Sequence, residues 1–156
     1  MAKYDDASWH YGGEFPDDLP DECGATHIGM FLTWCIKNNL ISDFLFEENK
    51  EDIERVRKGV LTGAEFLIEN CDAKFTDQDL NDIGNEFAKN YFENETDFSN
   101  KFANYLEDYL SVFEQKAIKN GFEYETIYHV ENTSENYLLL KPFIDKRFEQ
   151  WKTMNK

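Results

Sequence analysis

Basic residues, cysteine and proline are scarce in this sequence. Its 156 residues include 16 lysines and arginines against 32 aspartates and glutamates, with 3 cysteines and 3 prolines. The cysteines are odd in number and show no CxxC spacing (Cys23, Cys35 and Cys71). This usage is typical of a reduced, intracellular protein.

Long hydrophobic runs are also missing. The first residues, MAKYDDASWH, lack the apolar stretch of a secretory signal. No segment approaches the roughly 18 consecutive apolar residues of a membrane span. We therefore expect a cytoplasmic protein with no membrane segment.

The shortage of basic residues leaves a formal net charge of −16. This charge disfavours nucleic-acid binding, which depends on clusters of lysine and arginine, and it disfavours anionic membrane surfaces. A strongly negative surface suits a basic protein partner, whose approach it would accelerate. Such a charge also keeps a protein soluble without any partner.

What the sequence does contain is aromatic and apolar material, much of it in one stretch. Aromatic residues make up 16% of the chain. Residues 24–40 read GATHIGMFLTWCIKNNL, in which apolar side chains recur at helical spacing on two rows. A helix that is apolar on nearly every side lies inside a domain. We predict a buried central helix over about residues 25–38, with Ala25, Gly29 and Thr33 as a row of small residues that lets another element approach closely.

The rest of the chain fits further helices around this one. Residues 1–23, with their glycines and prolines, are predicted to form an extended N-terminal arm packed on the core, its acidic residues facing water (Asp5, Asp6, Glu14, Asp17, Asp18, Asp21 and Glu22). Helical patterns cover residues 50–58, 62–70, 76–92, 96–120 and 135–151, the last broken or kinked at Pro142. A capping box is predicted at Thr62 and Glu65.

Residues 124–130, YETIYHV, alternate in the manner of a strand. No second convincing strand is present to pair with them, so we interpret them as an extended connector. The predicted fold class is therefore all-α, a compact helical bundle around the buried central helix, and we expect a single domain over residues 1–156.

Several passages of the sequence look familiar together. They read YDDASWHYGGEFP at 4–16, GATHIGMFLTW at 24–34, CDAKFTDQDLNDIGNEFAKNYF at 71–92 and YHVENTSENY at 128–137. The chain resembles a family of small, uncharacterised bacterial proteins, known as a domain of unknown function. The resemblance implies a bacterial cytoplasmic protein and carries over no catalytic residue. Many uncharacterised bacterial families of this kind belong to toxin and immunity systems, and this general association is weaker evidence of function than a site would be.

The three histidines are the first candidates for chemistry. If the arm and the connector both cross the N-terminal end of the central helix, His10, His27 and His129 meet there, with Asp5 or Asp6 beside them. Such a histidine–carboxylate set suits Zn²⁺ or Fe²⁺. No tight ligand spacing such as HExxH supports a metal, and each histidine also has a purely structural interpretation. We therefore predict no bound cofactor.

A protein interface is the other candidate. Trp9 and Tyr11 are aromatic residues beside glycines on an acidic arm, and such side chains often anchor interfaces. The carboxylates that would face a basic partner lie on the arm and in the 76–97 region (Asp17, Asp18, Asp21, Glu22, Asp77, Asp79, Asp82 and Glu86). Packing of the arm on its own domain is the simpler account of the two aromatics.

We therefore favour an acidic, non-enzymatic protein that binds another protein, in its most concrete form an immunity-type inhibitor of a basic toxin. The alternative is a metal-dependent or small-molecule enzyme using His10, His27 and His129. A structural or regulatory subunit is a third possibility. The sequence leaves the oligomeric state open.

Overall fold

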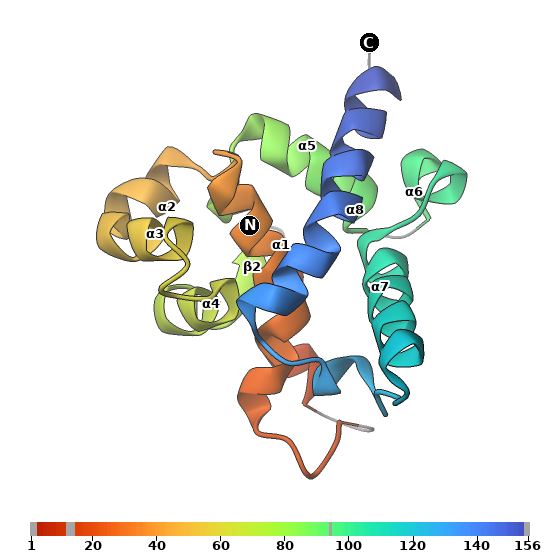
Figure 1. Ribbon diagram of the computed structural model, residues 1–156. Coiled ribbons are helices and arrows are strands. Elements are labelled where there is room, and N and C mark those ends of the chain that lie inside the picture. Colours follow the sequence, from red (N-terminus) through yellow and green to blue (C-terminus); the bar gives the residue numbers. More distant parts are fainter. Residues whose placement is uncertain (1–2, 12–14, 94, 155–156) are drawn as a thin grey trace.

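The central helix of the fold is α1 (Thr26–Lys37), and every residue from Thr26 to Ile36 is buried. The computed structural model describes residues 3–11, 15–93 and 95–154, and α1 runs through the middle of them (Figure 1). Phe31 is fully buried and stacks or tilts against six aromatic rings. The predicted buried helix is therefore confirmed.

The row of small residues on α1 receives α4 (Gly63–Asn70). A Cβ atom added at Gly29 would lie 2.2 Å from the backbone nitrogen of Ala64, and one added at Gly63 would lie 2.0 Å from the backbone oxygen of Gly29. Only residues without a side chain allow this approach. The predicted capping box, in which Thr62 and Glu65 satisfy each other's backbone N–H groups, begins α4.

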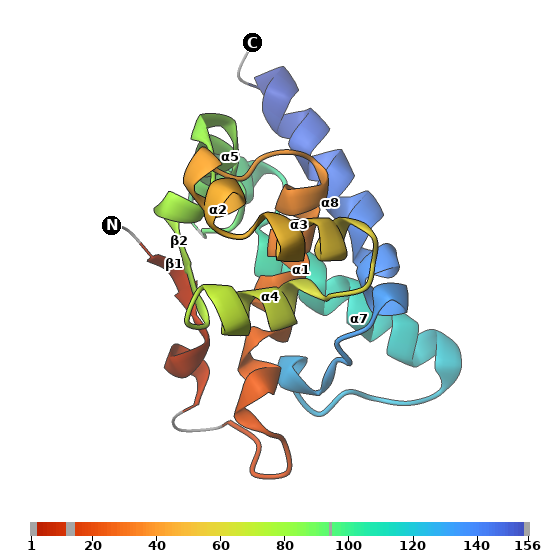
Figure 2. The same cartoon turned by 90° about the vertical axis from the view of Figure 1, so that its left-hand side faces the viewer.

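Other helices surround α1 (Figures 1 and 2). The short helices α2 (Asp43–Glu48) and α3 (Lys50–Arg57) lie on the same side of α1 as α4. α5 (Asp82–Tyr91) and α6 (Asp97–Lys101) follow, α7 (Tyr105–Asn120) lies on the opposite side, and α8 (Ser134–Met154) runs across the front of α1. The all-α fold class is confirmed, and no helix among the described residues is long and apolar enough to cross a membrane.

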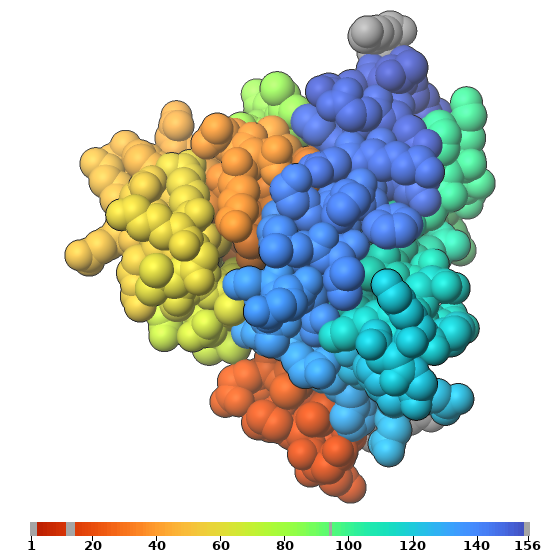
Figure 3. Space-filling model, viewed as in Figure 1, coloured from red at the N-terminus to blue at the C-terminus, as the bar shows by residue number. Residues whose placement is uncertain are grey.

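α8 crosses the front of the molecule in Figure 3, between the α2–α4 side and α7. Polar contacts hold it there, since Trp34 donates its indole N–H to Asp145 at 2.8 Å. Arg147 of α8 binds both carboxylate oxygens of the buried Asp108 on α7, at 3.0 and 3.1 Å. Tyr91 of α5 donates its hydroxyl to the same carboxylate. This buried ion pair joins three helices.

Two predicted helix boundaries are wrong, and the break considered at Pro142 does not occur. The single helix expected over 96–120 is interrupted, because α6 ends at Lys101 and Asn104 caps a new helix, α7, with its side chain. The helix expected from Thr76 begins at Asp82 instead, after a 3₁₀ turn η3 (Asp77–Asp79). α8 continues through Pro142 without a break.

The N-terminal arm contains a strand that the sequence analysis missed. β1 (Lys3–Asp6) pairs antiparallel with β2 (Lys74–Thr76), forming a two-stranded sheet. Two 3₁₀ turns follow β1, namely η1 (Ala7–His10) and η2 (Asp21–Ala25). Asp5 and Asp6, expected to face water, are buried at 8% and 2% exposure. Glu14, expected to face water as well, lies outside the described residues.

Candidate functional site

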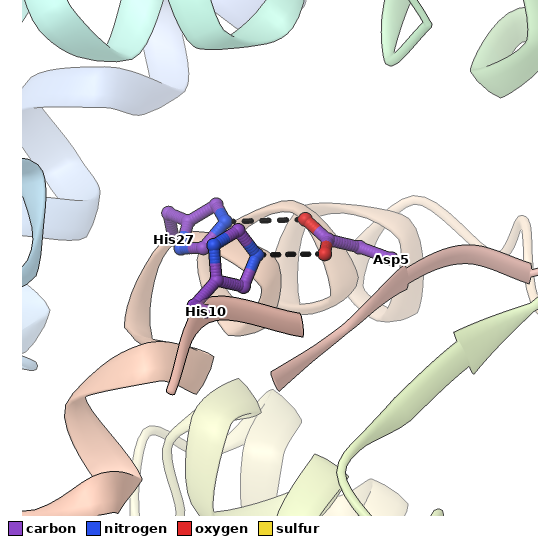
Figure 4. Close-up of side chains that lie close together, drawn as sticks. All are labelled: Asp5, His10 and His27. Carbon is purple, nitrogen blue, oxygen red and sulfur yellow. Dashed lines mark hydrogen bonds and ion pairs between the residues drawn. The ribbon is translucent and has the colours of Figure 1, made fainter. Parts of the chain in front are cut away.

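A buried polar group lies where the arm meets the start of α1. Asp5 comes from β1, His10 is the last residue of η1, and His27 is the second residue of α1 (Figure 4). The pairing of β1 with β2 fixes the aspartate, while the turn η1, capped by the Asp6 side chain, folds His10 back toward it. Three segments thus converge on one point.

The carboxylate of Asp5 bridges the two imidazoles. Its Oδ1 lies 2.8 Å from Nε2 of His10 and its Oδ2 lies 3.2 Å from Nε2 of His27. The backbone N–H of Asp6 donates to Oδ1 at 2.8 Å. One ligand atom from each of the three side chains lies within 4.8 Å of the other two. We call Asp5, His10 and His27 the D5–H10–H27 group.

Tyr128 extends this group. It lies on a fourth segment, the 3₁₀ turn η4 (Ile127–His129), and its hydroxyl oxygen is 2.7 Å from Nδ1 of His10. Tyr128 is not among the site residues predicted from the sequence. The only available signal was its position beside His129 on the connector that was expected to cross the end of the central helix.

Burial and hydrogen bonding set the charges of the group. Burial raises the pKa of the Asp5 carboxyl, but the hydrogen bonds and electrostatic interactions with His10 and His27 together outweigh burial and hold this pKa well below its usual range. Burial lowers the pKa of His27, although its contact with Asp5 opposes the shift. At neutral pH, Asp5 is therefore ionised and His27 is uncharged.

The structure does not bring His129 and Asp6 into the group. His129 contacts Asp18 through Nε2 at 3.1 Å and Thr126 through Nδ1 at 2.9 Å. Asp6 accepts hydrogen bonds from Ser8 and pairs with Lys3 at 2.9 Å. The three-histidine arrangement considered from the sequence is therefore replaced by two histidines and Asp5.

The candidate interface residues differ in exposure. Trp9 is 58% exposed and Tyr11 is exposed as well. Most of the acidic candidates are exposed, namely Asp17, Asp18, Asp21, Glu22, Asp82 and Glu86. Asp77 is partly buried. Asp79 is buried, and its carboxylate accepts a hydrogen bond from the backbone N–H of Thr76. The prediction that Asp79 lies on an exposed binding surface is therefore wrong, because the capping box of η3 turns its side chain inward.

A cleft of about 890 Å³ opens beside the group. His10 and Tyr128 line the cleft together with residues of α7 and of the segment 122–130. We call it the α7 cleft. Through the ring of His10, the D5–H10–H27 group thus adjoins a space large enough for a ligand.

Two kinds of chemistry fit this arrangement. Two imidazoles and a carboxylate form the donor set of many transition-metal sites. Without a metal, the chain of hydrogen bonds from Asp5 through His10 to Tyr128 could move a proton to or from the phenol at the cleft.

Comparison with known proteins gives a family but no activity. The family described as a domain of unknown function (DUF7832) matches residues 3–130, a range that contains the D5–H10–H27 group and Tyr128. No curated protein and no solved structure matches the chain.

Proposed function

This chain belongs to the DUF7832 family, a domain of unknown function, and we propose that it is a metal-binding protein. The D5–H10–H27 group would hold a divalent transition metal such as Zn²⁺, Co²⁺ or Fe²⁺. The observation that carries this proposal is the convergence of three ligand atoms, from three segments, within 4.8 Å of one another. Imidazole and carboxylate ligands suit these metals.

The protonation states of the group support metal binding. A histidine ligand must be uncharged and a carboxylate ligand must be ionised. The lowered pKa of His27 and the lowered pKa of Asp5 give both residues the required form at neutral pH. The net charge of −16 favours the approach of a cation.

The contact between Tyr128 and His10 supports the same role. A histidine that binds a metal through one ring nitrogen usually donates the N–H of the other nitrogen to a neighbouring group. With Nε2 of His10 on the metal, its Nδ1–H would donate to the Tyr128 oxygen, 2.7 Å away. The phenol would then orient the ligand from the cleft side.

Three protein ligands leave further coordination positions open, as catalytic sites require. The α7 cleft adjoins His10, so a water molecule or a small ligand could reach the metal from that side. Hydrolytic or other metal-assisted chemistry at this point is the enzymatic form of the proposal.

Metal binding can be measured directly. The purified protein is stripped with a chelator and titrated with Co²⁺, following the visible absorption of the bound ion, and with Zn²⁺ by calorimetry. We expect one equivalent to bind, and we expect His27→Ala or His10→Ala to remove it. Tyr128→Phe should keep the site and weaken the affinity about tenfold.

His129→Ala is the matched control, because His129 also lies beside carboxylates, Asp18 at 3.1 Å and Glu125 at 3.9 Å, but is outside the group. This variant should bind one equivalent with unchanged affinity. Absence of a stoichiometric ion in the wild type, or equal loss in the His129 variant, would show that the group is only a buried hydrogen-bonded cluster.

We also propose a second function, binding of a basic protein, which includes inhibition of a basic toxin. It is supported by exposed carboxylates close to the exposed Trp9 in the sequence (Asp17, Asp18, Asp21 and Glu22). Long-range attraction would speed association, and a few aromatic contacts would hold the complex. Mixing the protein with a basic nuclease and measuring its activity at low and high salt tests the inhibitory form.

A further inference from the structure

The α7 cleft has an apolar surface that the described residues leave open. Leu110 and Ile118 of α7 are 47% and 65% exposed, and Phe122 and Trp9 are exposed beside them. Leu110, Glu114 and Ile118 recur every four residues, so they lie along one face of the helix. Large apolar side chains gathered in this way mark an interaction site.

The charged residues of this cleft all have one sign. Glu114, Glu123 and Glu125 line it and are exposed, and the described residues that line it include no lysine or arginine. The nearest cations lie at its edges, Lys3 over the ring of Trp9 and Lys116 over the ring of Tyr124. A second apolar groove, between α7 and α8, differs because Lys116 and Lys119 line it along with Phe143. The acidic border is therefore a property of the α7 cleft and not of every apolar groove on the molecule.

We infer that the α7 cleft binds a basic amphipathic helix of a partner protein. Leu110 and Ile118, with Glu114 between them, span about 12 Å along α7, which matches about two turns of a partner helix. Leucine-type side chains of that helix would cover Leu110, Ile118 and Phe122. Its lysines or arginines would face Glu114, Glu123 and Glu125.

This inference rests on the second proposed function, for which it names the surface and the kind of partner. It does not require a metal in the D5–H10–H27 group, although His10 and Tyr128 line the same cleft, so a bound helix would also cover the approach to that group. A metal in the D5–H10–H27 group would sit behind His10, whereas the helix would lie along α7.

The test uses labelled synthetic peptides of 18 residues and fluorescence anisotropy at about 0.1 M salt. The probe peptide is built from leucine and lysine, with the leucines on one helical face. One comparison peptide replaces lysine by glutamate and another replaces leucine by serine. We expect the leucine–lysine peptide to bind with a micromolar Kd and both comparison peptides to bind at least about tenfold more weakly.

Variants locate the binding surface. Ile118→Ser and Glu123→Lys should each weaken the leucine–lysine peptide about tenfold. The matched controls are Phe143→Ser, an exposed apolar residue of the other groove, and Asp82→Lys, an exposed carboxylate on α5. Both controls should stay within about twofold of the wild type, and circular dichroism checks that every variant is folded.

Two results would overturn the inference in different ways. If no peptide binds, or if the glutamate peptide binds as tightly as the leucine–lysine peptide, the α7 cleft is not a binding site for basic helices. If Asp82→Lys weakens binding as much as Glu123→Lys, basic segments bind through the overall charge. The second proposed function would then stand without this surface.

Discussion

Two buried aspartates of this chain have pKa shifts in opposite directions, and their neighbours explain the difference. Asp5 is held ionised by hydrogen bonds and electrostatic interactions with two histidines, which together outweigh its burial. Asp79 has no histidine beside it, and burial raises its pKa from 3.8 to about 6 despite hydrogen bonds from Thr76. The first aspartate can serve as a ligand at neutral pH, while the second is a cost to folding there.

The raised pKa of Asp79 predicts that removing this carboxyl group stabilises the protein at neutral pH but not at acidic pH. The folded protein holds the Asp79 proton up to about pH 6, whereas the unfolded chain releases it near pH 4, so this residue lowers the free energy of unfolding as pH rises between these values. Asp79→Asn removes the ionisation and can still accept the Thr76 hydrogen bond. At pH 7 we expect the variant to be more stable by about 1–3 kcal/mol in urea denaturation.

That gain should disappear at pH 4, where Asp79 of the wild type is already protonated. Asp82→Asn is the control, since Asp82 is exposed and should change stability by less than about 1 kcal/mol. A loss of stability in Asp79→Asn at pH 7 would mean that the ionised carboxylate is needed to begin η3.

The sequence could identify some residues of the candidate site and not others. His10, His27 and Asp5 were predictable as neighbours, because a short arm that packs on the central helix has few places to put them. His129 was misplaced because Asp18 and Thr126 occupy its ring nitrogens. Tyr128 depends on a contact across 118 positions, and no local pattern encodes such a contact.

At the scale of elements, the close crossing of α1 and α4 depends on two glycines. A Cβ on Gly29 would lie 2.4 Å from the Cα atom of Ala64, a backbone atom that can yield only if the helices separate. Alanine would otherwise favour a helix by about 1 kcal/mol over glycine. We expect Gly29→Ala to lower the free energy of unfolding by about 2–3 kcal/mol, measured with urea.

Ser111→Ala provides the comparison, because this substitution improves helix propensity at an exposed position of α7, on the groove between α7 and α8. It should leave stability equal or slightly higher. Stabilisation by Gly29→Ala would contradict the packing shown here for α1 and α4.

The elements that sequence analysis identified are those with a strong helical period. α1 could be predicted because apolar residues cover it on nearly all sides, and α4 because its capping box is local. The sheet could not be predicted, since β2 has three residues and its pairing with β1 spans about seventy positions. The interruption between α6 and α7 was hidden because aromatic residues keep helical spacing across it.

At the scale of the whole molecule, like charges repel one another. The 32 acidic and 16 basic residues give a net charge of −16, and most acidic side chains lie near the surface. Surface ion pairs contribute little to stability. Added salt weakens both the repulsion among the acidic side chains and the attraction within ion pairs, and we expect the loss of repulsion to be the larger effect. We expect the Tm to rise by about 2–5 °C between roughly 10 and 200 mM NaCl.

Differential scanning calorimetry measures this change. Repeating the scan with an uncharged osmolyte in place of salt separates screening from general solvent effects. A Tm that falls with added salt would show that the ion pairs, such as Arg147 with Asp108, outweigh the net repulsion.

The contact between His10 and Tyr128 joins two residues that the ribosome adds at different times. The two residues are separated by 118 positions, so at about 5–20 residues per second the phenol is added roughly 6–24 s after the imidazole. For most of that interval, once His27 has been added, the nascent chain carries Asp5 and both histidines without Tyr128. An ion captured then would meet an unfinished set of contacts, and the site would be complete only after residue 128 has been added.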